Sequence, residues 1–295
     1  MTDELFGESW RLERQANGGR ILWFDRPGSS QNSLDRSTLI ELNEALAAVE
    51  TDREATLLAI QSGKPKGFCA GADLKQIRTI SSFVEFKGFG HLGIEVFDRL
   101  ESLAVPTVAV IHGPCLGGGL ELAMACRDRL AIEGGHAKLG LPEVNLGLIP
   151  GWDGIGRLPR LIGLAPALEL LVTGRTIEAE EANRIGLVDA IVATDRIETE
   201  LAHLAKRQGR PAPAPWPPDV WEEILGAARE PVNTGPEELR RAREILLDVV
   251  EADLTQGREA GREGAVTGLS TLAMSPEARA AMERFFNRAK SRNYR

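Results

Sequence analysis

Short apolar runs alternate with segments of helical periodicity over the first two thirds of the chain. Residues 34–50 place an apolar side chain every three or four positions, which is typical of a helix with one buried face. Apolar runs separated by helical segments predict an α/β fold with buried parallel strands. The runs lie at residues 20–25, 56–61, 107–111, 130–133 and 187–192.

A longer segment, about residues 80–104, combines helical spacing with Gly88, Gly90 and Gly93. Each glycine in a helix interior costs about 1 kcal/mol relative to alanine, because it loses more conformational freedom on folding. We therefore expect this helix to be irregular or mobile.

The pattern changes after residue 205 and divides the chain into three predicted regions. Residues 1–205 form the core, and residues 206–218, with five prolines from Pro211 to Pro218, form a stiff connector. Residues 219–295 are expected to form a helical C-terminal region. Its predicted helices cover residues 219–229 and 236–257, and a third begins at Ser275, where Ser-Pro-Glu is typical of a helix N-terminus.

Composition narrows the classes of function. The 295 residues carry 43 acidic and 35 basic side chains, a formal charge of −8, which argues against broad binding of nucleic acid or an anionic membrane. No apolar run reaches the roughly 18 residues of a membrane-spanning helix, and the N-terminus lacks a signal-peptide pattern. The three cysteines form no disulfide framework, which predicts a reducing, cytoplasmic location.

Metal and nucleotide cofactors are not expected. The four histidines are scattered, and neither a Cys-x-x-Cys pair nor a dinucleotide or P-loop fingerprint is present. His112, at a strand end, is interpreted as a structural histidine. The cysteines are interpreted as small buried residues: Cys69, Cys115 and Cys126.

The first chemical signal is a run of three glycines, Gly117 to Gly119, after an apolar strand that ends at Ile111. Glycines there allow a sharp turn and leave backbone N–H groups at the start of a helix accessible to a ligand. Such donors can bind a phosphate, or an oxyanion that develops during a reaction. The alternative is a tight packing turn between strand and helix.

Two glutamates in apolar surroundings are candidates for acid–base chemistry. Glu121 follows the glycines, and Glu143 lies in the stretch LGLPEVNLGLIPG. A carboxylate among apolar side chains must pair or shift its pKa, as general acids and bases do. The alternatives are a solvent-facing Glu121 that stabilises its helix dipole, and a Glu143 that begins a short helix. The two positions are 22 residues apart, so only the fold can bring them together.

Several longer motifs follow one another along the chain: FCAGADL, HGPCLGGGLELAMAC, LGLPEVNLGLIPG, RLPRLIG and TGRTIEAEEANRIGLVD, and later VVEADLTQGREAGREG. Taken together, these motifs resemble the enoyl-CoA hydratase/isomerase (crotonase) family, and within it the hydratase part of bacterial fatty-acid oxidation complex α-subunits. The resemblance spans about residues 10–195 and implies an α/β fold, a spiral of ββα repeats that binds acyl-CoA, with a C-terminal helical region.

The resemblance also implies roles for individual residues. The backbone N–H groups of Ala72 and Gly118 match the oxyanion hole for the thioester oxygen, and Glu121 and Glu143 match the two catalytic glutamates. The N–H of Gly151 matches a group that helps to hold the water. Other substrate- or water-binding positions are Ala70, Gly71, Asp73, Gly117 and Trp152. Arg26 and Lys75 match basic positions near the CoA phosphates, with plain surface charge as the alternative.

The implied activity is that of an enoyl-CoA hydratase, a lyase that adds water across the 2,3 double bond of 2-enoyl-CoA in fatty-acid β-oxidation. The CoA thioester is the substrate, and no metal or redox cofactor is needed. The alternatives are an enoyl-CoA isomerase and a non-catalytic acyl-CoA-binding module. The expected partners are further copies of the chain, in a trimer or hexamer, or a separate dehydrogenase or thiolase, since no dehydrogenase fingerprint precedes Arg295.

The sequence departs from the family in the loop after Gly151, where small residues and Thr-Gln-Arg are usual. Here Trp152 is bulky and Asp153 adds a carboxylate. One interpretation is an outward-facing loop without effect on the chemistry. The other is that Trp152 narrows the acyl pocket or changes the substrate class. The dienoyl-CoA isomerase branch has an aspartate in this loop, but it matches Gly151 rather than Asp153.

Overall fold

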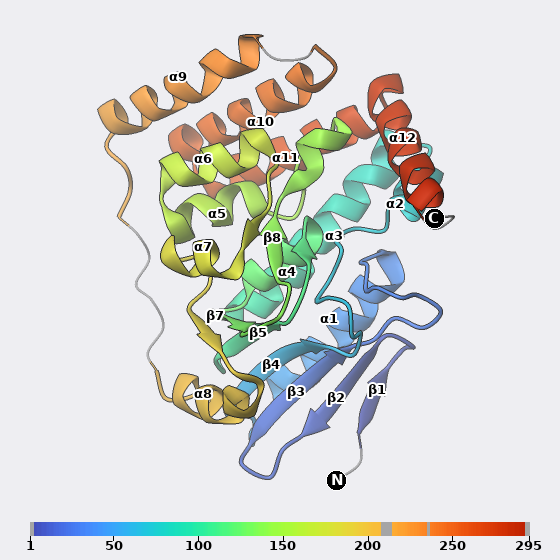
Figure 1. The fold of residues 1–295 in the computed structure, drawn as a ribbon, viewed down its shortest axis with the longest axis vertical. Coiled ribbons are helices and arrows are strands. Elements are labelled where there is room, and N and C mark those ends of the chain that lie inside the picture. Colours follow the sequence, from blue (N-terminus) through green and yellow to red (C-terminus); the bar gives the residue numbers. More distant parts are fainter. Residues whose placement is uncertain (1–2, 208–213, 235–236, 293–295) are drawn as a thin grey trace. The chain divides into compact units, whose positions relative to one another are not determined.

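The computed structural model describes residues 3–207, 214–234 and 237–292 (Figure 1). Two compact units alternate along the chain. The first unit comprises Met1–Ala72, Leu92–Gly140 and Thr176–Pro213, and the second comprises Asp73–His91, Leu141–Arg175 and Ala214–Arg295.

A seven-stranded sheet forms the centre of the first unit, in the order β1-β2-β3-β4-β5-β7-β10 (Figure 1). The first three strands pair antiparallel, and every later pairing is parallel. Every residue of the central strands β5 and β7 is buried, which explains the apolar run of β5 and that of residues 130–132 in β7. The strands are β1 (Glu4–Phe6), β2 (Trp10–Arg14), β3 (Gly19–Phe24), β4 (Leu57–Ser62), β5 (Thr107–Ile111), β7 (Asp128–Ile132) and β10 (Ala190–Val192).

The five predicted apolar runs correspond to β3, β4, β5, β7 and β10, so the expected α/β class is confirmed. A second sheet of three short strands joins β6 (Cys115–Leu116), β8 (Lys138–Gly140) and β9 (Ile177–Glu178). The helices of this unit are α1 (Arg36–Thr51), α4 (Gly118–Ala125), α7 (Ala179–Arg184) and α8 (Ile197–Leu204), with a 3-10 turn, η2 (Thr194–Arg196).

Helix α1 shows how local chemistry fixes an element. Its N-cap, Asp35, accepts a hydrogen bond from the backbone N–H of Thr38, and the Thr38 hydroxyl accepts one from the Asp35 N–H. This capping box satisfies donors that the first turn would otherwise leave unpaired. The apolar positions that predicted the helix are its buried face, including Leu39, Leu42 and Leu46.

Helix α3 (Phe83–Ser102) is continuous, so the irregularity expected from its glycines is wrong. Tertiary packing provides the reason at Gly90, where a Cβ atom would lie only 3.0 Å from Cγ1 of Val266. Close approach of a neighbouring helix therefore offsets the low helix propensity of that glycine. At Gly88 nothing lies within 4 Å of the place of a Cβ atom, and the structure offers no comparable reason there.

The second unit is mostly helical, and α10 packs against both α9 and α11 (Figure 1). Helices α9, α10 and α12 confirm the predicted C-terminal helices, and the Ser275 hydroxyl caps α12 by accepting from the Ala278 N–H at 3.2 Å. Residues 208–213, within the predicted connector, lie outside the described residues. The elements are α2 (Leu74–Thr79), η1 (Pro142–Leu146), α5 (Gly154–Ile162), α6 (Leu164–Thr173), α9 (Pro218–Thr234), α10 (Glu237–Gln256), α11 (Arg258–Ala273) and α12 (Pro276–Arg292).

Helix α11 is an element that the hydrophobic pattern did not predict. Its glycines weaken the helical signal in the sequence, yet they permit close packing on α10. A Cβ atom at Gly268 would lie 2.5 Å from Cγ2 of Ile245, and one at Gly261 would lie 2.6 Å from Cβ of Asp253. These glycines therefore serve the contact between α10 and α11.

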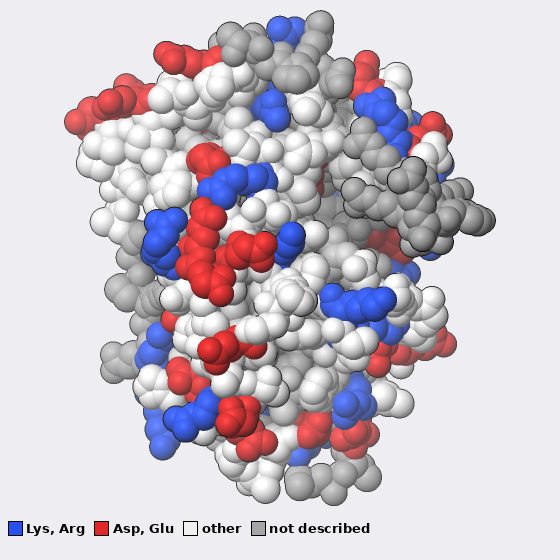
Figure 2. All heavy atoms as spheres, in the orientation of Figure 1, with Lys and Arg blue, Asp and Glu red and all other residues white. Residues whose placement is uncertain are grey.

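The surface charge and the helices were compared with two expectations from the composition: no broad basic surface and no membrane-spanning helix. On the face shown in Figure 2, acidic and basic side chains are interspersed, without one broad basic area. None of the helices in the described part of the chain combines the length and the apolar character needed to cross a membrane.

Candidate functional site

Two of the motifs lie side by side in the first unit. Cys69 and Cys115 form a parallel bridge, and the N–H of Leu116 donates to the Cys69 carbonyl at 3.0 Å. The N–H groups of Phe68 and Cys69 both donate to the Pro114 carbonyl, at 3.0 and 3.1 Å. The segment 68–72 is therefore aligned with the segment that leads into the three glycines.

Gly71 and Gly117 each adopt a conformation that favours glycine, with φ of 100° and 51°. A Cβ atom at Gly71 would lie 2.9 Å from the Leu116 carbonyl oxygen and 3.3 Å from the backbone nitrogen of Gly118. Gly118 is the first residue of α4, where an N–H group has no acceptor within the helix. The structure thus brings Gly71, the neighbour of Ala72, directly against the N-terminus of α4.

The third glycine confirms the packing interpretation for its own position. A Cβ atom at Gly119 would lie 2.5 Å from the Cys69 carbonyl oxygen, so only glycine fits there without a shift. The cysteines beside it are buried, as expected. Burial raises the pKa of the Cys69 thiol to about 12 and raises that of Cys115 well above its usual range, which disfavours the nucleophilic thiolate.

Glu121 is 1% exposed, so the interpretation of a solvent-facing glutamate is wrong. It lies in the first turn of α4, all eight residues of which are buried, and its N–H donates to the Gly117 carbonyl at 3.0 Å. The structure therefore places a buried carboxyl group in the first turn of α4.

Glu143 belongs to the second unit and lies in the first turn of η1, after Pro142. Its backbone carbonyl accepts from the N–H of Leu148 at 3.0 Å, and Gly147, with φ of 68°, ends the turn. The amide of Asn145 donates to the Gly174 carbonyl at 3.1 Å and anchors the turn to the end of α6. Pro142 and Glu143 begin a short 3-10 helix, and the side chain of Glu143 is half-buried.

The loop after Pro150 is buried, so the outward-facing interpretation is wrong. Trp152 and Asp153 are each 3% exposed. The Trp152 ring packs edge-on against Phe89, with 5.3 Å between ring centroids. A Cβ atom at Gly151 would lie 2.3 Å from Cδ2 of Leu269 on α11. The loop is thus enclosed by side chains of its own unit.

The remaining predicted positions have local structural partners. Asp73 is the N-cap of α2 and accepts from the Lys75 N–H at 2.8 Å, and the Lys75 side chain is exposed. Arg26 forms an ion pair with Asp35 and donates to the Ser33 hydroxyl at 2.5 Å. Ala70 is exposed. His112 bonds the Lys64 carbonyl through Nε2 at 2.8 Å, as expected for a structural histidine.

Asn32 supports the 68–70 segment and was missed by the sequence reasoning. It is 1% exposed, and its amide donates to the carbonyls of Phe24 and Phe68, at 2.6 and 3.3 Å. Its backbone carbonyl accepts from the Ala70 N–H at 2.8 Å. The partners are 8 to 38 positions away along the chain, so a single asparagine in the turn RPGSSQNS carried no signal of this role.

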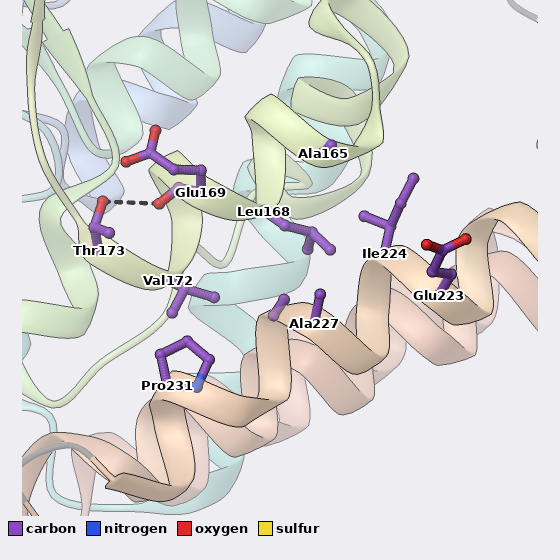
Figure 3. Close-up of a pocket in the computed structure, with 10 residues that line it drawn as sticks. Ala165, Leu168, Glu169, Val172, Thr173, Glu223, Ile224, Ala227 and Pro231 are labelled. Atoms are coloured by element: carbon purple, nitrogen blue, oxygen red, sulfur yellow. Dashed lines mark hydrogen bonds between the residues drawn. The ribbon is translucent and has the colours of Figure 1, made fainter.

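Two further observations limit what the described residues offer. No three His, Cys, Asp or Glu side chains among them are placed to hold a metal ion. An apolar cavity of about 390 Å³ lies between α6 and α9, walled by Leu168, Val172, Ile224 and Pro231 (Figure 3). None of the predicted site residues lines it.

Comparison with known proteins agrees with this arrangement of motifs. The family model for enoyl-CoA hydratase/isomerase matches residues 17–215. The curated relatives include the fatty acid oxidation complex subunit alpha of Shewanella baltica and of Shewanella loihica, 35% and 36% identical over 289 residues. Each match covers 95% of this chain and 41% of the relative, so the chain spans about two fifths of their length.

Solved structures share the fold. An enoyl-CoA hydratase from Bacillus anthracis is 30% identical, with a TM-score of 0.62 over 88% of this chain and 90% of that one. An enoyl-CoA hydratase/isomerase from Xanthobacter autotrophicus Py2 is 26% identical, with a TM-score of 0.68 over 93% and 91%. The expected crotonase-like α/β fold with a helical C-terminal region is therefore confirmed. The chain belongs to the enoyl-CoA hydratase/isomerase family.

Proposed function

We propose that the protein is an enoyl-CoA hydratase that adds water reversibly across the 2,3 double bond of 2-enoyl-CoA thioesters. The observation that carries the proposal is the buried Glu121 in the first turn of α4, whose N-terminus borders Gly71. A proton-exchanging carboxylate and backbone donors at a helix N-terminus are the two elements that hydration of a conjugated thioester requires.

The N–H groups of Ala72 and Gly118 are assigned to the thioester oxygen. Addition of water to C3 moves negative charge onto that oxygen, and fixed N–H donors stabilise it in the transition state more than in the ground state. Loss of one such donor typically lowers the rate by about 10²–10³. Support comes from the close approach of Gly71 to the Gly118 nitrogen.

The two glutamates are assigned to the water. Glu143 is the main acid and base, taking a proton from the water as oxygen attacks C3 and delivering a proton to C2. Glu121 orients and activates the same water, and the N–H of Gly151 helps to hold it. Removing a general acid–base group typically costs about 10²–10⁴ in rate.

The chemistry needs no metal or redox cofactor, because the thioester itself supplies the electron sink. We assign Arg26 and Lys75 to the binding of the CoA phosphates. A phosphate would have to compete for Arg26 with the Asp35 carboxylate and the Ser33 hydroxyl. The role in fatty-acid β-oxidation, a cytoplasmic location and assembly as a homo-oligomer or with a separate dehydrogenase or thiolase are parts of the same proposal. Relatives named as fatty acid oxidation complex subunits support the role in fatty-acid oxidation and the association with other subunits.

A hydration assay with mass detection of the product tests the proposal. The protein is incubated with 2-enoyl-CoA substrates of several chain lengths, and hydration adds the mass of water whereas double-bond isomerisation does not. We expect Glu143→Gln to lower kcat by about 10²–10⁴ while acyl-CoA binding is retained. Glu169→Gln on α6, an exposed glutamate paired with Arg175, is the matched control and should leave kcat unchanged.

The outcomes separate the candidate functions. Full activity of Glu143→Gln contradicts the two-glutamate assignment. Isomerised product without added water favours an isomerase, which one placed carboxylate can support. Binding of acyl-CoA without turnover at any chain length favours a non-catalytic module.

A further inference from the structure

Asp153 has an unusual backbone for a residue that is not glycine. Its φ is 72°, which makes it the one non-glycine residue with a positive φ in the part of the chain that the structure describes. Aspartate tolerates this left-handed region better than most residues, but the conformation persists only where surrounding contacts determine it. The side chain is 3% exposed, so those contacts come from the protein.

Arginines supply these contacts. Oδ2 of Asp153 accepts from Nε of Arg258 at 2.8 Å and from Nε of Arg262 at 3.0 Å. The Nη2 atoms of the same arginines lie at 2.7 and 2.9 Å, so each guanidinium approaches the carboxylate with two nitrogens. The two arginines are four residues apart on α11 and therefore share one face of that helix.

A third arginine links the carboxylate to the loop backbone. Nη1 of Arg157, one turn into α5, lies 3.8 Å from Oδ2 of Asp153 and donates to the Trp152 carbonyl at 2.8 Å. Arg157 is 3% exposed. The carboxylate is thus the centre of a cluster that ties the start of α5, the Trp152 backbone and α11 together.

The same helix also contacts the neighbours of Asp153. Cδ2 of Leu269 on α11 lies 2.3 Å from the place of a Cβ atom at Gly151, and Cγ1 of Val266 lies 3.0 Å from the place of a Cβ atom at Gly90. Gly90 follows Phe89, the ring that packs on Trp152. Helix α11 therefore packs against the Gly151 backbone, binds the Asp153 carboxylate, and packs against Gly90, the residue next to Phe89.

We propose that Asp153 is a positioning residue, which by binding Arg258 and Arg262 holds the Gly151–Trp152 segment in one conformation for the reaction. The role of the Gly151 N–H rests on the proposed function. The brace itself, meaning the contacts of Asp153 with Arg258 and Arg262, does not. A group that holds a reacting water tolerates little misplacement, and about 1 Å can cost about 10²-fold in rate. Release of the brace should therefore lower kcat more than it raises KM.

Amide hydrogen exchange tests the brace without reference to activity. Peptides that cover residues 148–156 are followed by mass spectrometry in the wild type, Asp153→Gly and Asp153→Asn. Glycine removes the carboxylate and accepts the positive φ, whereas asparagine keeps the shape and one acceptor. We expect exchange of this segment to accelerate about tenfold or more in Asp153→Gly and less in Asp153→Asn.

Asp253→Asn is the matched control. Asp253 is 9% exposed, and its carboxylate pairs with Arg160 at 2.9 Å, so it ties α5 to α10 through a different arginine from the three that surround Asp153. This variant should lower stability in urea without accelerating exchange in residues 148–156. Asp153→Gly should also lower kcat by about tenfold or more with KM within about twofold, with partial rescue by asparagine.

Equal exchange of this segment in Asp153→Gly and the wild type overturns the brace. Equal acceleration in Asp253→Asn does so too, because it reports general loosening. Accelerated exchange with unchanged kcat overturns the positioning role. A wild type that hydrates no enoyl-CoA refutes the proposed function and with it the positioning role, while exchange still decides whether the brace exists. If Asp153→Gly does not fold, Asp153→Asn decides between the same outcomes.

Discussion

Gly71→Ala is the change that most directly tests the link between fold and chemistry. The substitution places a side chain on a backbone with φ of 100° and brings its Cβ atom to 2.9 Å from the Leu116 carbonyl oxygen. The strained backbone costs about 1–3 kcal/mol, and overpacking against a fixed neighbour costs about 1–3 kcal/mol. We expect the free energy of unfolding to fall by about 2–6 kcal/mol, since both effects act together.

The same change should damage the proposed oxyanion hole. The new methyl group would also lie 3.3 Å from the nitrogen of Gly118, so Ala72 or α4 must move to accommodate it. We expect kcat for hydration to fall by about 10²–10³, the typical effect of losing one oxyanion donor. Urea unfolding followed by circular dichroism gives the stability, and the enoyl-CoA assay gives kcat.

Two control variants separate the cost of the strained backbone from the cost of the clash. Gly28→Ala has a φ of 69° with nothing within 4 Å of the added atom, so it should show strain alone, about 1–3 kcal/mol, and full activity. Gly119→Ala lacks the positive φ but places its Cβ atom 2.5 Å from the Cys69 carbonyl oxygen, so it should show the clash. A Gly71→Ala variant as stable and as active as Gly28→Ala would refute the reasoning.

Two further predictions concern the first unit. Asp189→Asn should lower the free energy of unfolding by about 3–5 kcal/mol in urea, because it leaves the fully buried Arg129, now paired at 3.2 Å, without its carboxylate; a loss below about 1 kcal/mol would contradict this. Burial raises the pKa of Asp35, but hydrogen bonds from Thr38 and Ser37 and the charge of Arg26 outweigh it and lower that pKa. The ionised cap therefore stabilises the fold above about pH 4, and this contribution is lost as the pH falls through the lowered pKa. Asp35→Ala should cost about 0.5–2 kcal/mol at pH 7 in urea unfolding, and the gap to the wild type should shrink towards pH 3; a gap independent of pH would exclude the charge as its source.

Much of the fold could be predicted because its signals are local. The strands β3, β4 and β5 and the buried face of α1 follow from side-chain periodicity alone. The geometry of a strand or helix fixes which positions along the chain share one face. Predictions were wrong or incomplete where glycine was decisive. The continuous α3 and the unpredicted α11 depend on helices packed closely at Gly90 and Gly268, and the sequence does not show which helix will approach.

The candidate site also has a part that the sequence predicts and a part that only the fold shows. The motifs around Gly118, Glu121 and Glu143 carried the family resemblance, because their residue types and order are readable along the chain. Burial of Glu121 and the approach of Gly71 to α4 required the folded first unit, since the two motifs are more than 40 positions apart. The sequence could name these residues but not their surroundings.

The sequence by itself determined the family and the α/β class, and it named Glu121 and Glu143 as candidate catalytic residues. Only the tertiary structure shows the surroundings of Asp153, a loop carboxylate that lies at the centre of an arginine cluster. Its partners Arg258 and Arg262 lie 105 and 109 positions away along the chain. The strength of an ion pair depends on the distance between its charges and on the exclusion of water from them. The spacing of residues along the chain encodes neither.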